Sequence, residues 1–276
     1  MADVKNYRDV LLEELGRKEY ENVTKSFDIV GNIAVINAKG GLAKKVGNAV
    51  MATHNRVETV LRKGGAVSGR YRTRKLHFVC GKRNYVARYR ENGVELVFDI
   101  RKVFFSPRLA FERKRIVDLS TDGENVIVMF AGVGPFAIEI ARKNRRSKVI
   151  AIELNRDAYK YLLGNIKGNN AANVEPVLGD AAKVSKKYRN FADRIVMPLP
   201  MKAKEFLDVA FLMAKRKAVI HYYTFIEGTQ ASEKRFLKKF AAKHHAKLKI
   251  MGERTVRPYS SRISEEVFDL EIKKSA

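Results

Sequence analysis

Two glycines and one acid are spaced in a way that suits ligand binding. Gly132 and Gly134 form a tight turn directly after the apolar run 126–130. Glu153 ends the next apolar run, 21 residues after Gly132. A glycine turn at the carboxyl end of a parallel strand brings backbone N–H groups close to a nucleotide-like ligand, and a carboxylate at this spacing can accept hydrogen bonds from a ribose diol. The pattern predicts a nucleotide-like cofactor; the alternative is an α/β domain whose crevice is unused.

The composition of the turn narrows the choice of cofactor. Pro135 stands where a third small residue would complete a pyrophosphate-binding fingerprint, and the lysine and hydroxyl residue of a P-loop are missing. The turn therefore favours a nucleoside without phosphates, for which S-adenosylmethionine is the obvious choice. Asp180, after the expected strand 174–178, could bond an adenine amine, and 192–199 is expected to be a further strand.

Glu112 is the candidate for proton transfer. It lies in 109–116, which we expect to be a helix that opens near Pro107 and leads into the strand before the glycine turn. Arg108 is four residues away, so both side chains would share one helical face. They could form a surface ion pair worth about 0.2–0.5 kcal/mol. Alternatively, the acid faces the crevice and takes part in chemistry, and spacing leaves both possibilities open.

A second group of charged residues occupies 69–74. In a strand, alternation would place Arg70, Arg72 and Arg74 on one face, where they could bind phosphate or an exposed base. A solvated basic edge accounts equally well for the same spacing.

The overall charge points to a polyanionic partner. The 276 residues include 55 Lys and Arg against 30 Asp and Glu, a net charge of +25. Cations that neutralise phosphates release condensed counterions, which drives binding. The ion-pair networks of a heat-stable surface would need acids in comparable number. Because the basic residues are spread along the chain, we expect a folded basic face that binds structured RNA or a duplex.

Several other classes of protein do not fit the composition. Cys80 is the only cysteine, so no intramolecular disulfide can form, and the five scattered histidines have no zinc-ligand spacing. We therefore expect no metal. An apolar content of 46% predicts a globular chain. The sequence has no apolar run of about 18 residues and no signal-peptide pattern, which predicts a cytoplasmic protein without a membrane segment. Nothing in it calls for a dimer, so we expect a monomer.

The elements that must position these residues fall into two halves. The first is expected to be a small α+β module of antiparallel strands, and the second, from about Ile116, alternates strands and helices as a parallel sheet does. We expect the segment 99–115 to join the halves rigidly and to line a site. The helices expected in the first half are 7–19 and 44–53, and its strands are a hairpin at 26–37 and the runs 59–61, 76–80, 85–89 and 95–100.

Several segments of the chain resemble the archaeal and eukaryotic tRNA (guanine-37 N1)-methyltransferase family over nearly its whole length. They are SFDIVGNIAVI (26–36), VSGRYRTRKL (67–76), ENGVELVFDI (91–100), FFSPRLAFER (104–113), MFAGVGPFAI (129–138), LGD (178–180), ADRIVMPLP (192–200) and IHYY (220–223). The resemblance implies an α/β protein in which a class I S-adenosylmethionine-dependent methyltransferase (Rossmann-like) domain, 99–276, follows a smaller α+β RNA-contacting module, 1–98.

The resemblance also implies a reaction and roles for individual residues. The tRNA anticodon arm would present guanosine 37 as a flipped-out base for methylation at N1. Glu112 would be the general base, Arg72 would stabilise charge on the purine O6, and Arg108 would bind phosphate or support the loop. The residues expected to line S-adenosylmethionine are Phe104, Phe130, Gly132, Gly134, Glu153, Asp180 and Pro200.

Two departures from the family pattern bear on the substrate. Pro198 stands where many members have an asparagine that helps to hold the target base. A proline variant occurs in an archaeal subgroup that also methylates C7 of the wyosine precursor 4-demethylwyosine, so a second substrate is an open alternative. We also expect the chain to lack the family's extra N-terminal domain, which would loosen discrimination among tRNAs.

Two further functions remain as alternatives. A sister family in wybutosine synthesis transfers the aminocarboxypropyl group of the same cofactor. Its segment at 105–109 resembles FSPRL less, which favours methyl transfer. A non-catalytic RNA-binding protein with a vestigial cofactor fold is the other alternative, and the intact strip that ends at Glu153 and Asp180 argues against it.

Overall fold

The protein consists of two compact units in a computed structural model that describes residues 6–65, 69 and 71–275. Unit 1 is Met1–Arg108 and unit 2 is Leu109–Ala276. The division falls inside the segment 99–115 that was expected to join two halves. None of the helices in the described part of the chain is both long enough and apolar enough to cross a membrane.

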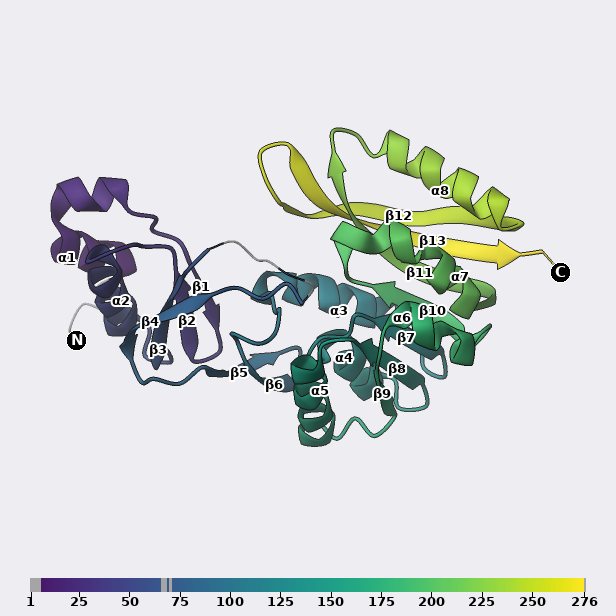
Figure 1. The fold of residues 1–276 in the computed structure, drawn as a ribbon, viewed down its shortest axis with the longest axis horizontal. Helices are drawn as coiled ribbons and strands as arrows, with labels where there is room; N and C mark the ends of the chain where they lie inside the picture. The colour runs from purple at the N-terminus through teal and green to yellow at the C-terminus, as the bar shows by residue number, and fades with distance from the viewer. Residues whose placement is uncertain (1–5, 66–68, 70, 276) are drawn as a thin grey trace. The chain divides into compact units, whose positions relative to one another are not determined.

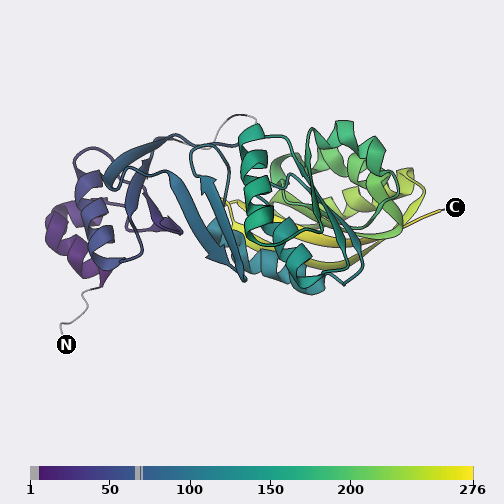
Figure 2. The same cartoon turned by 90° about the horizontal axis from the view of Figure 1, so that it is seen from below.

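Unit 1 packs two helices over a small sheet (Figures 1 and 2). Asn6 begins the first helix, because its side chain accepts hydrogen bonds from the backbone N–H groups of Arg8 and Asp9. Apolar residues of both helices meet those of the central strands in one core. The elements are α1 (Tyr7–Asn22), β1 (Phe27–Val30), β2 (Ile33–Ile36), α2 (Leu42–Thr53), β3 (Thr59–Lys63), β4 (Leu76–Gly81), β5 (Val86–Glu91) and β6 (Val94–Asp99).

The sheet of unit 1 is not wholly antiparallel, and that prediction was wrong. Its strand order is β1-β2-β3-β4, and β2 pairs with β3 in parallel. The reason is the connection between them: α2 carries the chain back across the sheet, as a parallel pair requires. The hairpin expected at 26–37 is confirmed as the antiparallel pair β1 and β2, and β5 and β6 form a separate hairpin.

Unit 2 contains a seven-stranded sheet with helices on both faces (Figure 1). Its elements include short 3₁₀ helices, labelled η. They are η1 (Pro107–Leu109, which straddles the division), α3 (Ala110–Leu119), β7 (Asn125–Met129), α4 (Pro135–Lys143), β8 (Lys148–Glu153), α5 (Arg156–Gly168), β9 (Val174–Leu178), α6 (Ala181–Val184), η2 (Ser185–Tyr188), β10 (Ala192–Met197), η3 (Pro200–Phe206), α7 (Leu207–Met213), β11 (Ala214–Glu227), α8 (Ala231–Lys243), β12 (Ala246–Pro258) and β13 (Ile263–Lys274).

The strand order of unit 2 reverses direction beside β7. The order is β12-β13-β11-β10-β7-β8-β9. The strands β7 to β11 pair with one another in parallel, whereas β13 is antiparallel to β11. From β7 the chain builds outward through β8 and β9, and then returns to place β10 on the other side of β7. Ligands bind outside the carboxyl ends of the strands at such a reversal. The predicted Rossmann-like α/β fold is confirmed.

Alternating side chains bury both faces of this sheet. On one face, residues such as Ile127, Ile195 and Tyr222 pack against α7 and α8 in one large apolar cluster. On the other face, α4 and α5 lie against β8 and β9, and α3 packs on α4. A strand buried on both faces must be apolar almost throughout, which explains why the sequence of 126–130 predicts a strand without any alternation.

The edge strand β12 is irregular. It is antiparallel to β13, but the register shifts between Ile250 and Gly252 and again between Thr255 and Arg257. Along its length exposed and partly buried residues alternate, so one row of its side chains faces solvent. Two of the residues in that row are the lysines Lys247 and Lys249.

Candidate active site

The glycine turn after β7 is shaped by three residues with positive φ. Phe130, Gly132 and Gly134 have φ of 55°, 59° and 97°. A Cβ on Gly134 would lie 2.5 Å from Leu162 Cδ1 and would have to displace that side chain, and the positive φ would strain any other residue at this position. At Gly132, by contrast, a Cβ would meet nothing within 4 Å. The backbone of Gly132 therefore borders open space, which suits a ligand that approaches the turn closely.

Glu153, the last residue of β8, lies directly beside this turn. Its carboxylate accepts hydrogen bonds from the backbone N–H groups of Gly132 and Asn155, both at 2.7 Å. Burial raises the pKa of Glu153, against the effect of these backbone donors. A carboxylate has about four acceptor positions, so it can also accept a bond from a hydroxyl group. The acid predicted for a ribose diol is thus placed at the glycine turn.

The remaining predicted cofactor residues of unit 2 surround the same edge of the sheet. Gly179, next to Asp180, donates its backbone N–H to the Glu153 carbonyl at 2.9 Å. Asp180 caps α6 by accepting the Ala182 N–H at 3.0 Å. On the β10 side, Pro200 is buried at the start of η3, and Phe206 at its end meets the ring of Phe130 edge-on at 4.8 Å. The two phenylalanines and the proline supply apolar side chains near the ends of β7 and β10.

Glu112 is buried in the first turn of α3, with 3% of its surface exposed. The Tyr223 hydroxyl donates to its Oε1 at 2.6 Å, and Arg115 donates to the same carboxylate from Nη2 at 2.8 Å and from Nε at 3.0 Å. Burial, and then the charge of Glu112, raise the pKa of Tyr223 well above its usual range. The tyrosine therefore remains a proton donor to Glu112.

The strand register places Glu112 at the crevice edge of the sheet. In β11, Tyr222 pairs with Met197, the last residue of β10. Tyr223 is one residue further on, and its ring lies 6.3 Å from that of Phe136 in the first turn of α4. Since α4 begins at the glycine turn, the acid bonded to Tyr223 lies on the side of the sheet where the cofactor is expected.

Arg108 and Glu112 do not form the i,i+4 pair that was one of the two alternatives. Arg108 lies in the 3₁₀ turn η1, before α3 begins at Ala110, so it lacks the helical spacing that such a pair needs. Its guanidinium pairs with Asp28 of β1, with Nη2 at 2.6 Å from Oδ1. Arg115, three residues further along the helix, pairs with Glu112 at 2.8 Å.

Arg72 does not have the strand geometry that would be needed to place alternate residues of 69–74 on one face. Arg72 is in a turn with φ of 53°, and its backbone N–H donates to the Gly69 carbonyl at 3.1 Å. Arg70 lies outside the described residues, so the shared face proposed for Arg70, Arg72 and Arg74 cannot be described. The Arg72 guanidinium lies 4.6 Å from the ring centre of Phe104, which brings together two of the predicted site residues of unit 1.

Sequence reasoning missed four polar residues around Glu112. Arg115 could have been found from its i,i+3 spacing to the acid. Tyr223 lies in the segment IHYY, which was noted for its resemblance and not for its chemistry. Asp269 and Arg254 lie far along the chain and gave no signal. Arg254 Nη1 is 3.9 Å from Glu112 Oε2, and its guanidinium lies 5.1 Å from the ring centre of Phe111, whose surface is 69% exposed.

Two family models match the chain. The model described as TRM5/TYW2 methyltransferase domain matches residues 87–251, and the one described as TYW2 N-terminal domain matches residues 7–84.

Individual relatives cover most of the chain. The tRNA (guanine(37)-N(1))-methyltransferase Trm5b of Pyrococcus abyssi is 42% identical over 86% of this chain and 72% of its own length. Its crystal structure superposes with a TM-score of 0.88 at 38% identity, over 99% of this chain and 82% of that one. The tRNA (guanine(37)-N(1))/4-demethylwyosine(37)-methyltransferase Taw22 of Nanoarchaeum equitans is 29% identical over 87% of this chain and 98% of its own. The structure of Methanocaldococcus jannaschii TYW2 in complex with AdoMet has a TM-score of 0.72 at 27% identity, over 91% of this chain and all (100%) of that one.

Proposed function

Because the chain belongs to the TRM5/TYW2 methyltransferase family, we propose that it transfers a methyl group from S-adenosylmethionine to N1 of guanosine 37 in tRNA. One observation carries this proposal. Glu112 is a buried acid at the crevice edge of a cofactor-binding sheet, and it is held there by the Tyr223 hydroxyl and the Arg115 guanidinium. A carboxylate fixed in this way is suited to accept a proton from a substrate.

The residues of the crevice fit the proposed cofactor. S-adenosylmethionine, when bound, supplies a methyl group activated by a positively charged sulfur. Gly132 leaves space against its backbone, and Glu153 offers its carboxylate to the ribose hydroxyls. Asp180 lies at the end of the next strand, where it can accept from the adenine amine. Phe130 and Pro200 supply apolar surface.

Glu112 acts as the general base in this proposal. As the bond between guanine N1 and the methyl carbon forms, the N1 proton passes to Glu112 and the carbon–sulfur bond breaks. Tyr223 and Arg115 limit the positions that the carboxylate can take, which lowers the cost of orienting it. Arg72 is proposed to stabilise negative charge on O6, with Phe104 supporting its guanidinium by a cation–π contact.

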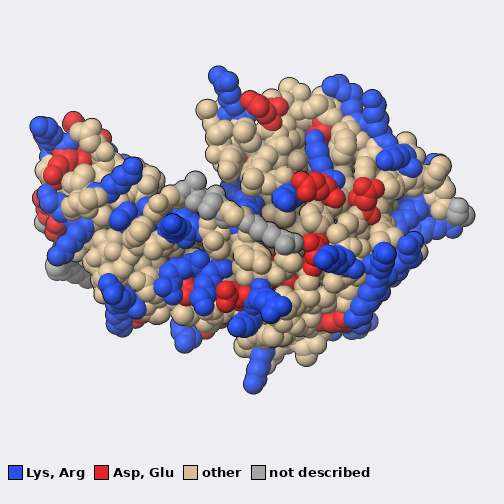
Figure 3. All heavy atoms as spheres, in the orientation of Figure 1, with Lys and Arg blue, Asp and Glu red and all other residues tan. Residues whose placement is uncertain are grey.

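The charge distribution supports tRNA as the partner. Groups of Lys and Arg side chains are scattered over the drawn face of both units (Figure 3), and in the whole chain 55 Lys and Arg stand against 30 Asp and Glu. Contacts to phosphate give affinity and position an RNA without reading its sequence. Arg108 is proposed to support the segment that precedes α3, since its guanidinium is already paired with Asp28.

A second substrate is favoured by one observation. The chain resembles Taw22, whose name includes 4-demethylwyosine, over 87% of its length. Pro198, where the family resemblance implies an asparagine, is the position at which we expect the choice of substrate to be made. We therefore propose C7 of 4-demethylwyosine as an additional methyl acceptor. An asparagine side chain at this position would offer an amide to the base, so Pro198→Asn should shift the ratio of the two activities toward guanosine.

The reaction is tested with an unmodified tRNA transcript that carries guanosine at position 37. Mass spectrometry of its nucleosides after incubation with protein and S-adenosylmethionine should find 1-methylguanosine. A transcript with adenosine at position 37 is the matched control and should gain no methyl group there. An aminocarboxypropyl adduct would indicate the sister activity instead, and calorimetry that found no cofactor binding would contradict both enzymatic functions.

A further inference from the structure

A chain of charged side chains leads from Glu112 into the interior of unit 2. Every neighbouring pair is joined by a hydrogen bond or an ion pair, and most members are buried. This chain of side chains runs along the face of β11 and β13 that carries Tyr223. His221 lies two residues before Tyr223 in β11, so both side chains project from the same face, and Asp269 of β13 is the cross-strand partner of His221. Its members in order are Glu112, Arg115, Asp269, His221, Arg194 and Glu124.

Arg115 is shared between two acids. Its Nη2 lies 2.8 Å from Glu112 Oε1, while its Nη1 lies 2.6 Å from Asp269 Oδ2. Burial disfavours the charged guanidinium, but the bonds to both carboxylates raise the pKa of Arg115 above its usual value. The arginine is therefore a fixed positive charge with one partner on each side.

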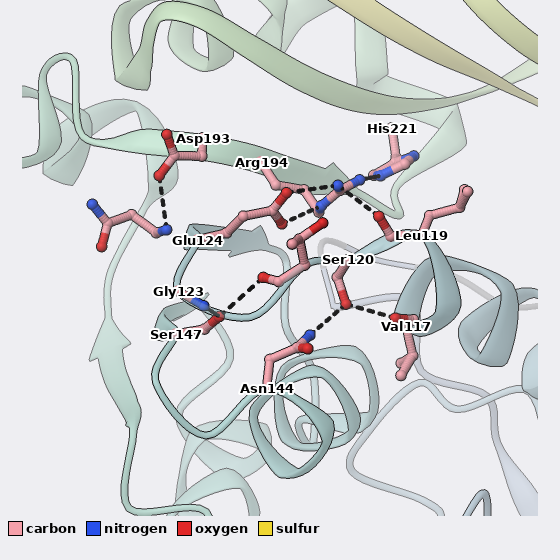
Figure 4. A network of polar contacts seen from close by, with 12 residues as sticks. Val117, Leu119, Ser120, Gly123, Glu124, Asn144, Ser147, Asp193, Arg194 and His221 are labelled. Atoms are coloured by element: carbon pink, nitrogen blue, oxygen red, sulfur yellow. Dashed lines mark hydrogen bonds and ion pairs between the residues drawn. The ribbon is translucent and has the colours of Figure 1, made fainter.

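The far end of the chain fixes the protonation of His221. Arg194 can only donate, and its Nη1 is 2.7 Å from His221 Nε2, so that nitrogen must be the acceptor (Figure 4). The proton is then on Nδ1, which donates to Asp269 Oδ1 at 2.6 Å. Burial lowers the pKa of His221, in agreement with a neutral ring. His221 thus orients Asp269 without neutralising it.

On the basis of the function proposed above, we infer that Asp269 is a positioning residue for the general base. When Glu112 accepts the proton from guanine N1, its charge disappears while Arg115 stays buried and charged. A buried charge that loses its partner is strongly unfavourable. Asp269 supplies the second anion that keeps Arg115 paired in both states of Glu112. It also fixes the guanidinium that aims the Glu112 carboxylate.

The test is Asp269→Asn, which keeps the size of the side chain and removes its charge. In single-turnover assays with unmodified tRNA transcript, we expect methyl transfer to slow by about 10- to 100-fold, the range seen when a group that orients an active-site ligand is lost. The dissociation constants for tRNA and S-adenosylmethionine should change less than about threefold, because Asp269 is proposed to act only on the chemical step.

Asp193→Asn is the matched control for this variant. Asp193 accepts from Lys215 Nζ at 2.7 Å and from the Asn125 N–H at 2.9 Å, at the beginning of β10 and far along the strand from the crevice edge. The same loss of charge there should leave the rate within about twofold of the wild type. Thermal melting of both variants separates a rate effect from general destabilisation.

A double-mutant cycle with Glu112→Gln shows whether Asp269 acts through the base. We expect Asp269→Asn to have no further effect on the rate once Glu112 has been replaced, because the charge it compensates no longer changes. Equal rate losses in both backgrounds, or a wild-type rate for Asp269→Asn, would overturn the inference alone. A wild-type protein that fails to methylate the transcript would overturn the proposed function as well.

Discussion

Tyr222 and Tyr223 are neighbours in β11, and each donates its hydroxyl to a buried acid, but on opposite faces of the sheet. Tyr222 bonds Glu233 of α8 at 2.8 Å, and Tyr223 bonds Glu112 of α3 at 2.6 Å. Burial raises the pKa of both tyrosines, so both remain donors. Strand alternation alone sends them to different faces.

The two acids differ in the cation that completes each pair. Glu233 is bonded by Lys204 of η3 at 2.8 Å, a compact ammonium whose side chain is 54% exposed. Glu112 is bonded by Arg115, whose fork also holds Asp269 and is only 17% exposed. A lysine neutralises an acid, whereas an arginine fork also fixes the orientation of the carboxylate. A tyrosine–glutamate pair thus joins η3 to α8 on one face, and a second such pair holds the proposed general base on the other.

The largest expected difference between the two pairs follows from removing each charge. Glu112→Gln should slow methyl transfer by about 10²- to 10⁴-fold, because it removes the proton acceptor, and it should leave cofactor affinity unchanged. Glu233→Gln should leave the rate within about threefold. Single-turnover kinetics and calorimetry measure both. A Glu112→Gln enzyme with normal activity would exclude the proposed base.

Removing each hydroxyl should give a smaller contrast of the same kind. Tyr223→Phe leaves the Glu112 carboxylate one donor short, and we expect the rate to fall about tenfold because a hydrogen bond to a charged group contributes about 1.5–3 kcal/mol. Tyr222→Phe should lower the free energy of unfolding by a similar amount with little change in rate. Denaturant unfolding combined with single-turnover rates checks this, and equal rate losses in the two variants would contradict it.

The stability contributed by the Glu112 face should depend on pH, because Asp269 lies on that face. Burial opposes ionisation, but the bonds from His221 and Arg115 hold the pKa of Asp269 well below its usual range. Its stabilising contribution is therefore present above the unfolded pKa of about 3.9 and is lost as the pH falls toward the folded value. The difference in melting temperature between wild type and Asp269→Asn should be largest near neutral pH and should narrow below about pH 4. A constant difference down to pH 3 would contradict this.

The smallest effect on the rate is expected from Lys204→Met. The variant leaves the buried Glu233 carboxylate bonded to the Tyr222 hydroxyl but without its ammonium partner, and a buried charge that loses its partner is destabilising. We expect a lower melting temperature and an unchanged rate. A loss of activity comparable to that of Tyr223→Phe would show that the Glu233 side of the sheet also takes part in the reaction.

Local patterns predicted the strands around the glycine turn of unit 2. The apolar run 126–130 and the expected strand 174–178 correspond to β7 and β9, and the expected strand 192–199 contains β10. These predictions succeed because a parallel strand buried on both faces and a glycine turn each require particular residue types at consecutive positions. The proposed cofactor residues Gly132, Glu153 and Asp180 were found with these strands, since each lies at or just after the end of one.

Contacts between distant parts of the chain could not be predicted in this way. Arg115 and Asp269 are 154 residues apart, and they meet because β13 enters the sheet beside β11. The parallel pair β2 and β3 was missed because single strands carry no sign of their partner's direction. Around Arg72, the positive φ excludes the strand alternation that was one of the two possibilities for 69–74.

The irregular edge strand β12 should make this protein less prone to aggregate in concentrated solution. A long, flat edge strand would recruit strands from other molecules and start aggregation. In β12, two register shifts twist the free edge, Pro258 ends it without a donor, and Lys247 and Lys249 place charge along it. A nascent or partly unfolded molecule is thereby discouraged from pairing with its neighbours, so the same lysine-rich surface that suits a polyanion also keeps copies of the chain apart.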